Sequence, residues 1–158
     1  MTAPGVEIER KFLVDALPPE LDGVPSRRIQ QGYLAVAPDG VEVRLRREDD
    51  HVELTIKSGP AMVRVEEHVA VDARQFEALW PLTEGRRLSK TRHLVPLGDG
   101  LTAEVDVYDD ALDGLLTAEV EFPSAQASEA FTPPPWLGAE VTGDKRYANQ
   151  SLATAGRP

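Results

Sequence analysis

Charged residues recur at every second position along several apolar stretches of the sequence. Seven of them are cations, namely Lys11, Arg44, Arg46, Lys57, Arg64, Lys90 and Arg92. Seven others are acids, namely Glu7, Glu9, Glu66, Glu104, Asp106, Glu119 and Glu121. Carboxylates clustered without His or Cys are hard oxygen ligands that suit Mg²⁺ or Mn²⁺, whereas Arg and Lys suit phosphate oxygens. A metal ion and several cations acting on a polyanion form the arrangement that phosphoryl transfer requires.

The alternation that places these residues has a period of two, which is typical of β-strands with one polar and one apolar face. Eight strands are predicted, near residues 5–14, 28–37, 41–48, 51–58, 62–71, 86–97, 101–110 and 115–122. Short links rich in Gly and Asp separate most of them and indicate antiparallel hairpins. Three short helices are predicted, over 72–80, 125–131 and 144–153. We therefore expect one mainly β domain over residues 1–158, with its core over about 5–153.

The charged strand faces fit two arrangements, which this pattern alone leaves open. In a β-sandwich they would form a solvated outer surface. In a closed barrel they would point inward, while helices cover the apolar outer faces. Repetition of Arg-x-Arg and Glu-x-Glu on nearly every strand favours the barrel, since ordinary solvated faces are richer in Thr, Ser, Gln and Lys. The seven cations would then balance the seven acids, and the net charge of −10 would belong to the remaining surface.

The composition excludes several classes of function. The 158 residues include 17 Lys and Arg against 27 Asp and Glu, a balance that argues against binding to nucleic acid or to anionic membranes. The chain has no Cys, which excludes disulfides, thiolate nucleophiles and Cys-ligated zinc. It has no P-loop, no apolar run of the ~20 residues that a membrane span needs, and no signal-peptide pattern. We therefore expect a cytoplasmic protein.

The order of the motifs resembles the CYTH domain of the triphosphate tunnel metalloenzymes. The run Glu7-Ile8-Glu9-Arg10-Lys11, at the start of the first predicted strand, resembles the ExExK signature of that family. The later motifs follow in the family's order: Gln31-Gly32-Tyr33-Leu34, Arg44-Leu45-Arg46, Leu54-Thr55-Ile56-Lys57, Lys90-Thr91-Arg92, Glu104-Val105-Asp106-Val107-Tyr108, Glu119-Val120-Glu121-Phe122, and Glu140-Val141-Thr142 with Tyr147, Asn149 and Leu152. The chain is similar in this respect both to short bacterial inorganic triphosphatases and to class IV adenylyl cyclases.

The resemblance implies a closed eight-stranded antiparallel barrel, or tunnel, which acts on triphosphate substrates with Mg²⁺ or Mn²⁺. It implies that the seven cations hold the phosphates, and that Lys11, Lys57 and Arg92 also take part in the reaction. The acids would bind metal: Glu7, Glu9, Glu119 and Glu121 as ligands of one ion, and Glu66, Glu104 and Asp106 serving a second ion or the attacking water. One departure is His68, which stands where short family members often carry the second acid of Arg-x-Glu-x-Glu.

Among triphosphate substrates, the residues favour one without a base. Aromatic residues make up only 6 % of the chain and leave little surface on which an adenine could stack. We expect hydrolysis of inorganic tripolyphosphate to pyrophosphate and phosphate. A class IV-like adenylyl cyclase, a nucleoside or thiamine triphosphatase, and a non-catalytic polyphosphate-binding module remain as alternatives, and a homodimer is also left open.

Overall fold

The computed structural model describes residues 8–58 and 65–158. Nine strands account for most of them: β1 (Ile8–Val14), β2 (Ser26–Val36), β3 (Glu42–Glu48), β4 (His51–Lys57), β5 (Glu66–Ala70), β6 (Arg87–Gly98), β7 (Leu101–Tyr108), β8 (Leu116–Phe122) and β9 (Leu137–Glu140). The α-helices are α1 (Ala73–Leu79), α2 (Ala125–Ala130) and α3 (Asn149–Ala155), and the 3₁₀-helices are η1 (Pro19–Gly23), η2 (Trp80–Thr83), η3 (Asp110–Leu112) and η4 (Lys145–Tyr147). The mainly β class and the three helices were predicted.

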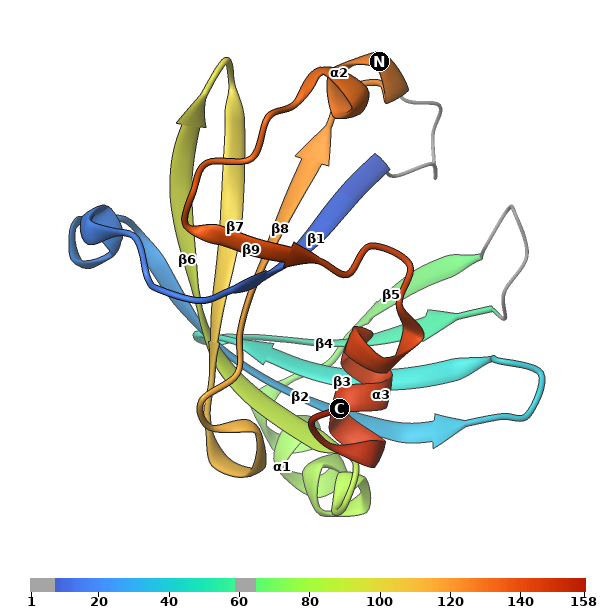
Figure 1. Cartoon of the computed structure of the whole chain (residues 1–158). Helices are drawn as coiled ribbons and strands as arrows, with labels where there is room; N and C mark the ends of the chain where they lie inside the picture. The colour runs from blue at the N-terminus through green and yellow to red at the C-terminus, as the bar shows by residue number, and fades with distance from the viewer. Residues whose placement is uncertain (1–7, 59–64) are drawn as a thin grey trace.

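All nine strands form one antiparallel sheet in the order β5-β4-β3-β2-β6-β7-β8-β1-β9. The sheet is strongly curved, so that β3, β4 and β5 lie across from β7, β8 and β1, and α3 lies on the concave side (Figure 1). Eight of the strands match the predicted ones, whereas β9 was not predicted.

The expected closure of the barrel is not found among the described residues, where β5 and β9 are the two edges of the sheet. The reason lies at β1, the strand that closure would join to β5. Its free side already pairs with β9, through Phe12 opposite Glu140 and Val14 opposite Leu137. The backbone N–H of Val141 extends this pairing by donating to the carbonyl of Lys11 at 2.8 Å. The described sheet is therefore open, with the C-terminal segment along one edge.

The apolar strand faces build a core on the convex side of the sheet. A buried cluster there joins β1, β6, β7 and β8 to the segments that cover them: Phe12, Val14, Leu21, Val95, Ala103, Val105, Ala118, Val120, Phe122 and Leu137. Phe131, just after α2, packs edge-on against the rings of Phe12 and Phe122. Burial of side chains of this size stabilises the fold by roughly 1.5–3 kcal/mol each. The charged faces are thereby left to the concave side, as the barrel arrangement predicted.

Two helices cover other parts of the sheet. The predicted α1 begins with a capping box, in which Asp72 accepts from the backbone of Gln75 and Gln75 accepts from the backbone of Asp72. Its Phe76 is buried, and the guanidinium of Arg47 lies 4.1 Å from the ring centre. On the concave side, Leu152 of α3 packs in a second buried cluster with Tyr108.

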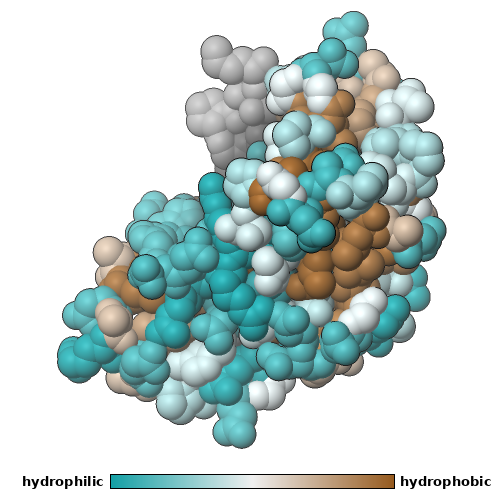
Figure 2. Space-filling model, turned by 90° about the vertical axis from the view of Figure 1, so that its left-hand side faces the viewer, coloured by the Kyte–Doolittle hydropathy of each residue, from teal (hydrophilic) through white to brown (hydrophobic). Residues whose placement is uncertain are grey.

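The surface is uneven in polarity. On the face turned to the viewer in Figure 2, apolar residues gather in one region that hydrophilic residues surround. Within the described part of the chain, no helix is long and apolar enough to cross a membrane.

Candidate active site

Strand register brings the predicted charged residues onto one face of the sheet. Residues directly opposite each other in an antiparallel pair point to the same side. Glu119 is opposite both Lys11 and Glu104, which joins β1, β8 and β7 in one charged row. On the other half of the sheet, Lys57 is opposite Glu66. These rows occupy the concave face, so the two halves of the sheet direct their charges toward each other.

A cavity of about 700 Å³ lies between this concave face and residues 141–151. Eleven of the predicted site residues line it: Glu9, Lys11, Arg44, Arg46, Lys57, Glu66, Lys90, Arg92, Glu104, Glu119 and Glu121. Asp106 does not line the cavity but lies buried beneath it. Glu7 and Arg64 are outside the described residues. The volume is in the range of ordinary ligand pockets.

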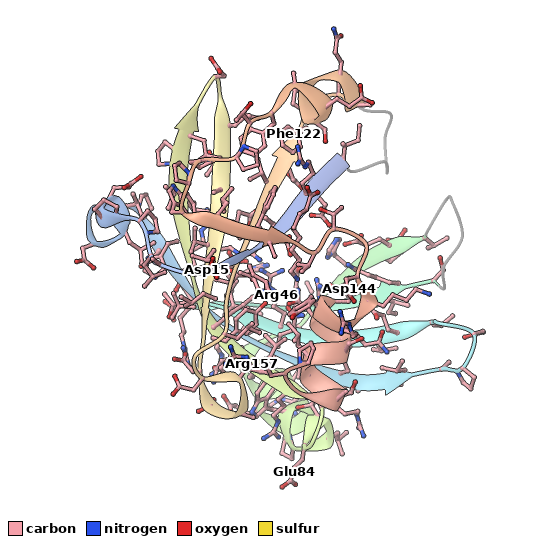
Figure 3. The ribbon with its side chains drawn as sticks, in the orientation of Figure 1. Asp15, Arg46, Glu84, Phe122, Asp144 and Arg157 are labelled. Carbon is pink, nitrogen blue, oxygen red and sulfur yellow. The ribbon has the colours of Figure 1, made fainter. Side chains whose placement is uncertain are left out.

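β3 supplies two cations with unsatisfied hydrogen-bond donors. Arg44 is only 8 % exposed, its Nη2 lies 3.4 Å from Thr55 Oγ1, and its Nε has no partner among the described residues. The buried Nε of Arg46 is likewise unpartnered within the described chain, while its Nη2 contacts Glu48 at 3.3 Å. Burial and the nearby Arg44 lower the pKa of Arg46. Figure 3 shows Arg46 inside the curve of the sheet. Buried guanidinium donors without partners are typical of an anion-binding site.

The opposite arrangement is found on β6, where both cations are held by one buried carboxylate. Lys90 Nζ lies 2.8 Å from Asp106 Oδ2, and Arg92 donates to both oxygens of Asp106 at 2.8 and 2.9 Å. Burial would raise the pKa of Asp106, but the two cations outweigh it and lower that pKa to about 2. Burial lowers the pKa of Lys90 to about 8, against the attraction of Asp106. Arg92 also contacts Glu104 at 2.5 Å.

The hydrogen bonding and burial of Asp106 therefore differ from those expected of a metal ligand. Both of its oxygens already accept hydrogen bonds, and its side chain is almost completely buried. Its position suits the fixing of Lys90 and Arg92 at the cavity wall.

Lys11 and Lys57, the two lysines predicted to be catalytic, contact acids that are less buried than Asp106. Lys11 Nζ donates to the backbone carbonyl of Tyr147 at 2.5 Å and lies 3.4 Å from Glu119. Lys57 Nζ lies 3.9 Å from Glu66, at the edge of ion-pair distance. His68, the departure from the family pattern, faces the same side of the sheet and contacts Glu66 through Nε2 at 3.3 Å. Both lysines line the cavity and can turn toward a bound anion.

The acidic wall faces these cations from β1, β7 and β8. Glu9 is directly opposite Glu121, and Glu104 is directly opposite Glu119. Like charges placed opposite each other destabilise a sheet, and a cation between them relieves the repulsion. The four carboxylates are also the hard oxygen donors that divalent metals prefer. Among the described residues no three acids or His converge closely enough to hold an ion as they stand. In donor chemistry and charge, this wall fits a divalent metal.

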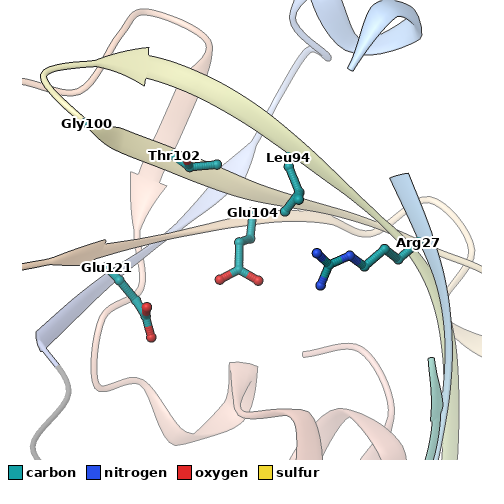
Figure 4. Close-up of a pocket in the computed structure, with 6 residues that line it drawn as sticks. All are labelled: Arg27, Leu94, Gly100, Thr102, Glu104 and Glu121. Atoms are coloured by element: carbon teal, nitrogen blue, oxygen red, sulfur yellow. The ribbon is translucent and has the colours of Figure 1, made fainter. Parts of the chain in front are cut away.

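A second cavity of about 360 Å³ continues from the first, because Glu104 and Glu121 line both. Arg27 on β2 supplies its cation, and its side chain points with Glu104 and Glu121 into the same space (Figure 4). Sequence reasoning missed Arg27, although it is directly opposite Arg92. Its neighbours Arg28 and Ser26 give no alternation by which it could have been found.

The C-terminal segment was also missed as part of the site. Thr142, Asp144, Lys145 and Asn149 line the main cavity from the side that faces the sheet. The sequence motif in which Asn149 stands was recognised, but nothing in its spacing indicated that it meets the cavity.

A curved antiparallel sheet whose concave face carries cations across from carboxylates defines the triphosphate tunnel class of protein. Comparison with known proteins narrows this class. The chain is 50 % identical over 148 residues to an inorganic triphosphatase of Nitrosomonas europaea, covering 93 % of this chain and 96 % of that protein. It is 37 % identical over 153 residues to an inorganic triphosphatase of Acetivibrio thermocellus, covering 94 % and 93 % of the two chains.

A solved structure agrees with these relatives. The crystal structure of the inorganic triphosphatase NE1496 matches with a TM-score of 0.81 and 44 % sequence identity, over 97 % of each chain. No family model matches the sequence. The chain belongs to the CYTH-like triphosphate tunnel family, in the group of the inorganic triphosphatases.

Proposed function

We propose that this protein is a divalent-metal-dependent hydrolase that converts inorganic tripolyphosphate to pyrophosphate and phosphate. The observation that carries the proposal is the concave face, where guanidinium donors of β3 that lack a partner in the described part of the chain lie across from the carboxylates of β1, β7 and β8. The identity to two inorganic triphosphatases over nearly the whole chain supports the choice of substrate.

In this proposal the substrate lies along the cavity with its phosphates against the basic walls. Arg44 and Arg46 bind phosphate oxygens from β3, and Lys90 and Arg92 bind them from β6. Lys57 exchanges its long contact with Glu66 for phosphate oxygens, while Lys11 keeps the carbonyl of Tyr147 and directs another N–H at a phosphate. A guanidinium binds two phosphate oxygens at once and a lysine ammonium acts as a point charge, so together they fix both the position and the charge of the chain.

The acidic wall holds the metal. Glu9, Glu104, Glu119 and Glu121 are the described residues that we assign to it, with Glu7 as a further ligand outside the described part. When bound, a divalent ion such as Mg²⁺ or Mn²⁺ supplies Lewis acidity toward the phosphate oxygens and activation of water. Glu66 lies apart from this wall, on β5, where its carboxylate contacts Lys57 and His68. We therefore give Glu66 the role of holding these two side chains.

The cations have two effects on the reaction. They neutralise the substrate so that an attacking oxygen can approach a terminal phosphorus, and they stabilise the charge on the leaving pyrophosphate. Loss of one such preorganised donor typically lowers turnover by about 10²–10³-fold. We propose that residues 141–151 complete the wall of a tunnel around the substrate, on the side where the described sheet is open.

The test is a product analysis by ion chromatography. The purified protein is incubated with Mg²⁺ or Mn²⁺ and, separately, with tripolyphosphate, ATP and thiamine triphosphate. We expect equal amounts of pyrophosphate and phosphate from tripolyphosphate, formed much faster than any product from the other two, and no turnover with a chelator. Cyclic AMP from ATP would identify a cyclase instead. Binding of tripolyphosphate without turnover would identify a receptor.

A pair of variants links the activity to the cavity. Lys57→Ala removes a cation from the cavity, and turnover should fall on the order of 10²–10³-fold. Arg28→Ala is the matched control, because Arg28 is an exposed cation that pairs with Asp109 and does not line the cavity. Equal activity in the two variants would contradict the assignment of Lys57.

A further inference from the structure

The C-terminal segment reaches two of the cavity's lysines, which lie on different strands. It leaves β1 after β9, and Thr142 Oγ1 accepts from the backbone N–H of Lys11 at 3.0 Å. It then crosses the cavity through η4 and begins α3, which packs on β6 and β2. The segment thus spans from β1 to β6, with β7 and β8 between them in the sheet.

Both contacts from this segment to the lysines are made by uncharged oxygen atoms. The backbone carbonyl of Tyr147 accepts from Lys11 Nζ at 2.5 Å. Two residues later, Asn149 Oδ1 accepts from Lys90 Nζ at 3.4 Å and from the Tyr108 hydroxyl at 3.2 Å. Burial raises the pKa of Tyr108, so this hydroxyl stays protonated and donates. Because an ammonium group can only donate, the amide oxygen of Asn149 is the atom that faces it.

The side chain of Asn149 has no local structural role that would account for this position. Asn149 is the first residue of α3, but the helix start has no side-chain cap. Within the described residues, its amide oxygen contacts Lys90 and Tyr108 across the cavity. The amide is therefore directed at a lysine of the site rather than at its own helix.

An uncharged acceptor differs physically from a carboxylate at this place. A carboxylate would orient Lys90 equally well, but it would place a second negative charge beside an ammonium that already shares Asp106 with Arg92. An amide oxygen fixes the direction of the ammonium and leaves its charge to act on a phosphate. With Asp106 and Asn149 each taking one N–H, one of the three N–H groups of Lys90 is left for the substrate.

We propose that Asn149 is a positioning residue for Lys90: its uncharged oxygen directs the ammonium toward the substrate without neutralising it. In the same segment, the backbone carbonyl of Tyr147 is likewise an uncharged acceptor that orients the ammonium group of Lys11. This inference rests on the proposed function, because it assumes that Lys90 binds a phosphate.

The test compares Asn149→Asp with Asn149→Ala. Asparagine and aspartate have the same shape, so Asn149→Asp keeps the acceptor and adds a charge, whereas Asn149→Ala removes the acceptor. Affinity for tripolyphosphate is measured by calorimetry without metal, so that no turnover occurs, and kcat and KM are measured with metal. Thermal unfolding of each variant reports on folding.

We expect Asn149→Ala to weaken binding about tenfold, which is the size of one hydrogen bond to a charged group. Asn149→Asp should weaken it more, on the order of a hundredfold, with a matching rise in KM and with unfolding at or above the wild-type temperature. The isosteric variant is thus expected to be the worse binder and the more stable protein. A merely structural role predicts the reverse order, with Asn149→Asp close to wild type in binding.

Thr154→Asp is the matched control, because it adds the same charge to α3 at an exposed position that does not line the cavity. A similar loss of binding in Thr154→Asp and Asn149→Asp would overturn the proposal, as would wild-type binding in Asn149→Asp. The proposed function fails separately, if the wild-type protein binds tripolyphosphate and does not hydrolyse it. In that case the order of the binding constants still tests the role of Asn149.

Discussion

Arg44 is the residue at which burial and charge conflict most sharply. It is 8 % exposed, makes no ion pair among the described residues, and shares the concave face of β3 with a second cation, Arg46. A buried charge without a counterion destabilises the fold, and a neighbouring like charge adds to the cost. We therefore predict that Arg44→Met makes the protein more stable and less active. Methionine has a similar length and no charge, so it fills the same space.

The two effects can be estimated from typical energies of buried charges and of ion pairs. Replacing buried charge by well-packed apolar atoms commonly stabilises a protein by about 1–4 kcal/mol. A cation at about 4 Å from a phosphate oxygen contributes about 4 kcal/mol at an effective dielectric constant of 20. Since about 1.4 kcal/mol corresponds to a factor of ten, kcat/KM for tripolyphosphate should fall on the order of 10³-fold.

The assay is urea unfolding and steady-state kinetics on the same preparation. Arg46→Met serves as the control, because Arg46 has Glu48 as a partner and its loss leaves that carboxylate with one cation fewer. We expect this variant to gain less stability than Arg44→Met. If Arg44→Met were destabilised by more than about 1 kcal/mol while keeping its activity, Arg44 would be a structural residue and the reasoning would be wrong.

Three further changes test other parts of the site and fold. Asp106→Asn leaves two cations on β6 without their buried counterion and should lower the free energy of unfolding by about 3–5 kcal/mol, measured in urea; a loss below 1 kcal/mol would mean that the ion cluster is weakly coupled. Because burial lowers the pKa of Lys90 to about 8, tripolyphosphate affinity should fall as pH rises through 8, whereas the stability contribution of this group rises between about pH 8 and 10.5, where the unfolded chain binds more protons. A pH-independent affinity over that window would contradict the assignment of Lys90 to a phosphate. Gly32→Ala would place a Cβ atom 2.6 Å from the side chain of buried Thr83 and should cost about 1–3 kcal/mol, seen as a lower unfolding temperature; an unchanged temperature would show that η2 can move away.

The faces of the strands could be predicted from the sequence because alternation is a local property. Arg44 and Arg46 are two residues apart, and so are Glu119 and Glu121, so each pair must share a face whenever a strand forms. Repetition of such pairs on nearly every strand then favoured an inward orientation. The cavity contains both pairs, as that argument predicts.

Features that depend on which strands meet could not be predicted in this way. β9 has only four residues, too few for a period to be visible, and it takes the edge of β1 that closure of the barrel would use. Asp106 alternates like Glu104, but register places it opposite Arg92, where it is a buried counterion of Lys90 and Arg92. Arg27 enters the site only because β2 pairs with β6.

Burial of the cavity's cations destabilises the fold, whereas their charge favours anion binding, and the two strands balance these effects differently. On β6, Asp106 stabilises Lys90 and Arg92 in place and lowers their net attraction for an anion. On β3, Arg44 has no such partner among the described residues, so its charge is not offset by a carboxylate and is held at a cost in stability. If every cation were paired like those of β6, a triphosphate would have to displace a carboxylate at each contact. If none were paired, mutual repulsion would open the sheet.

A bound polyanion relieves the repulsion on β3 and should therefore stabilise the folded protein. The expected gain in the free energy of unfolding is RT ln(1 + [L]/Kd), about 2.7 kcal/mol at a ligand concentration of a hundred times Kd. Most of this gain should disappear in Arg44→Met.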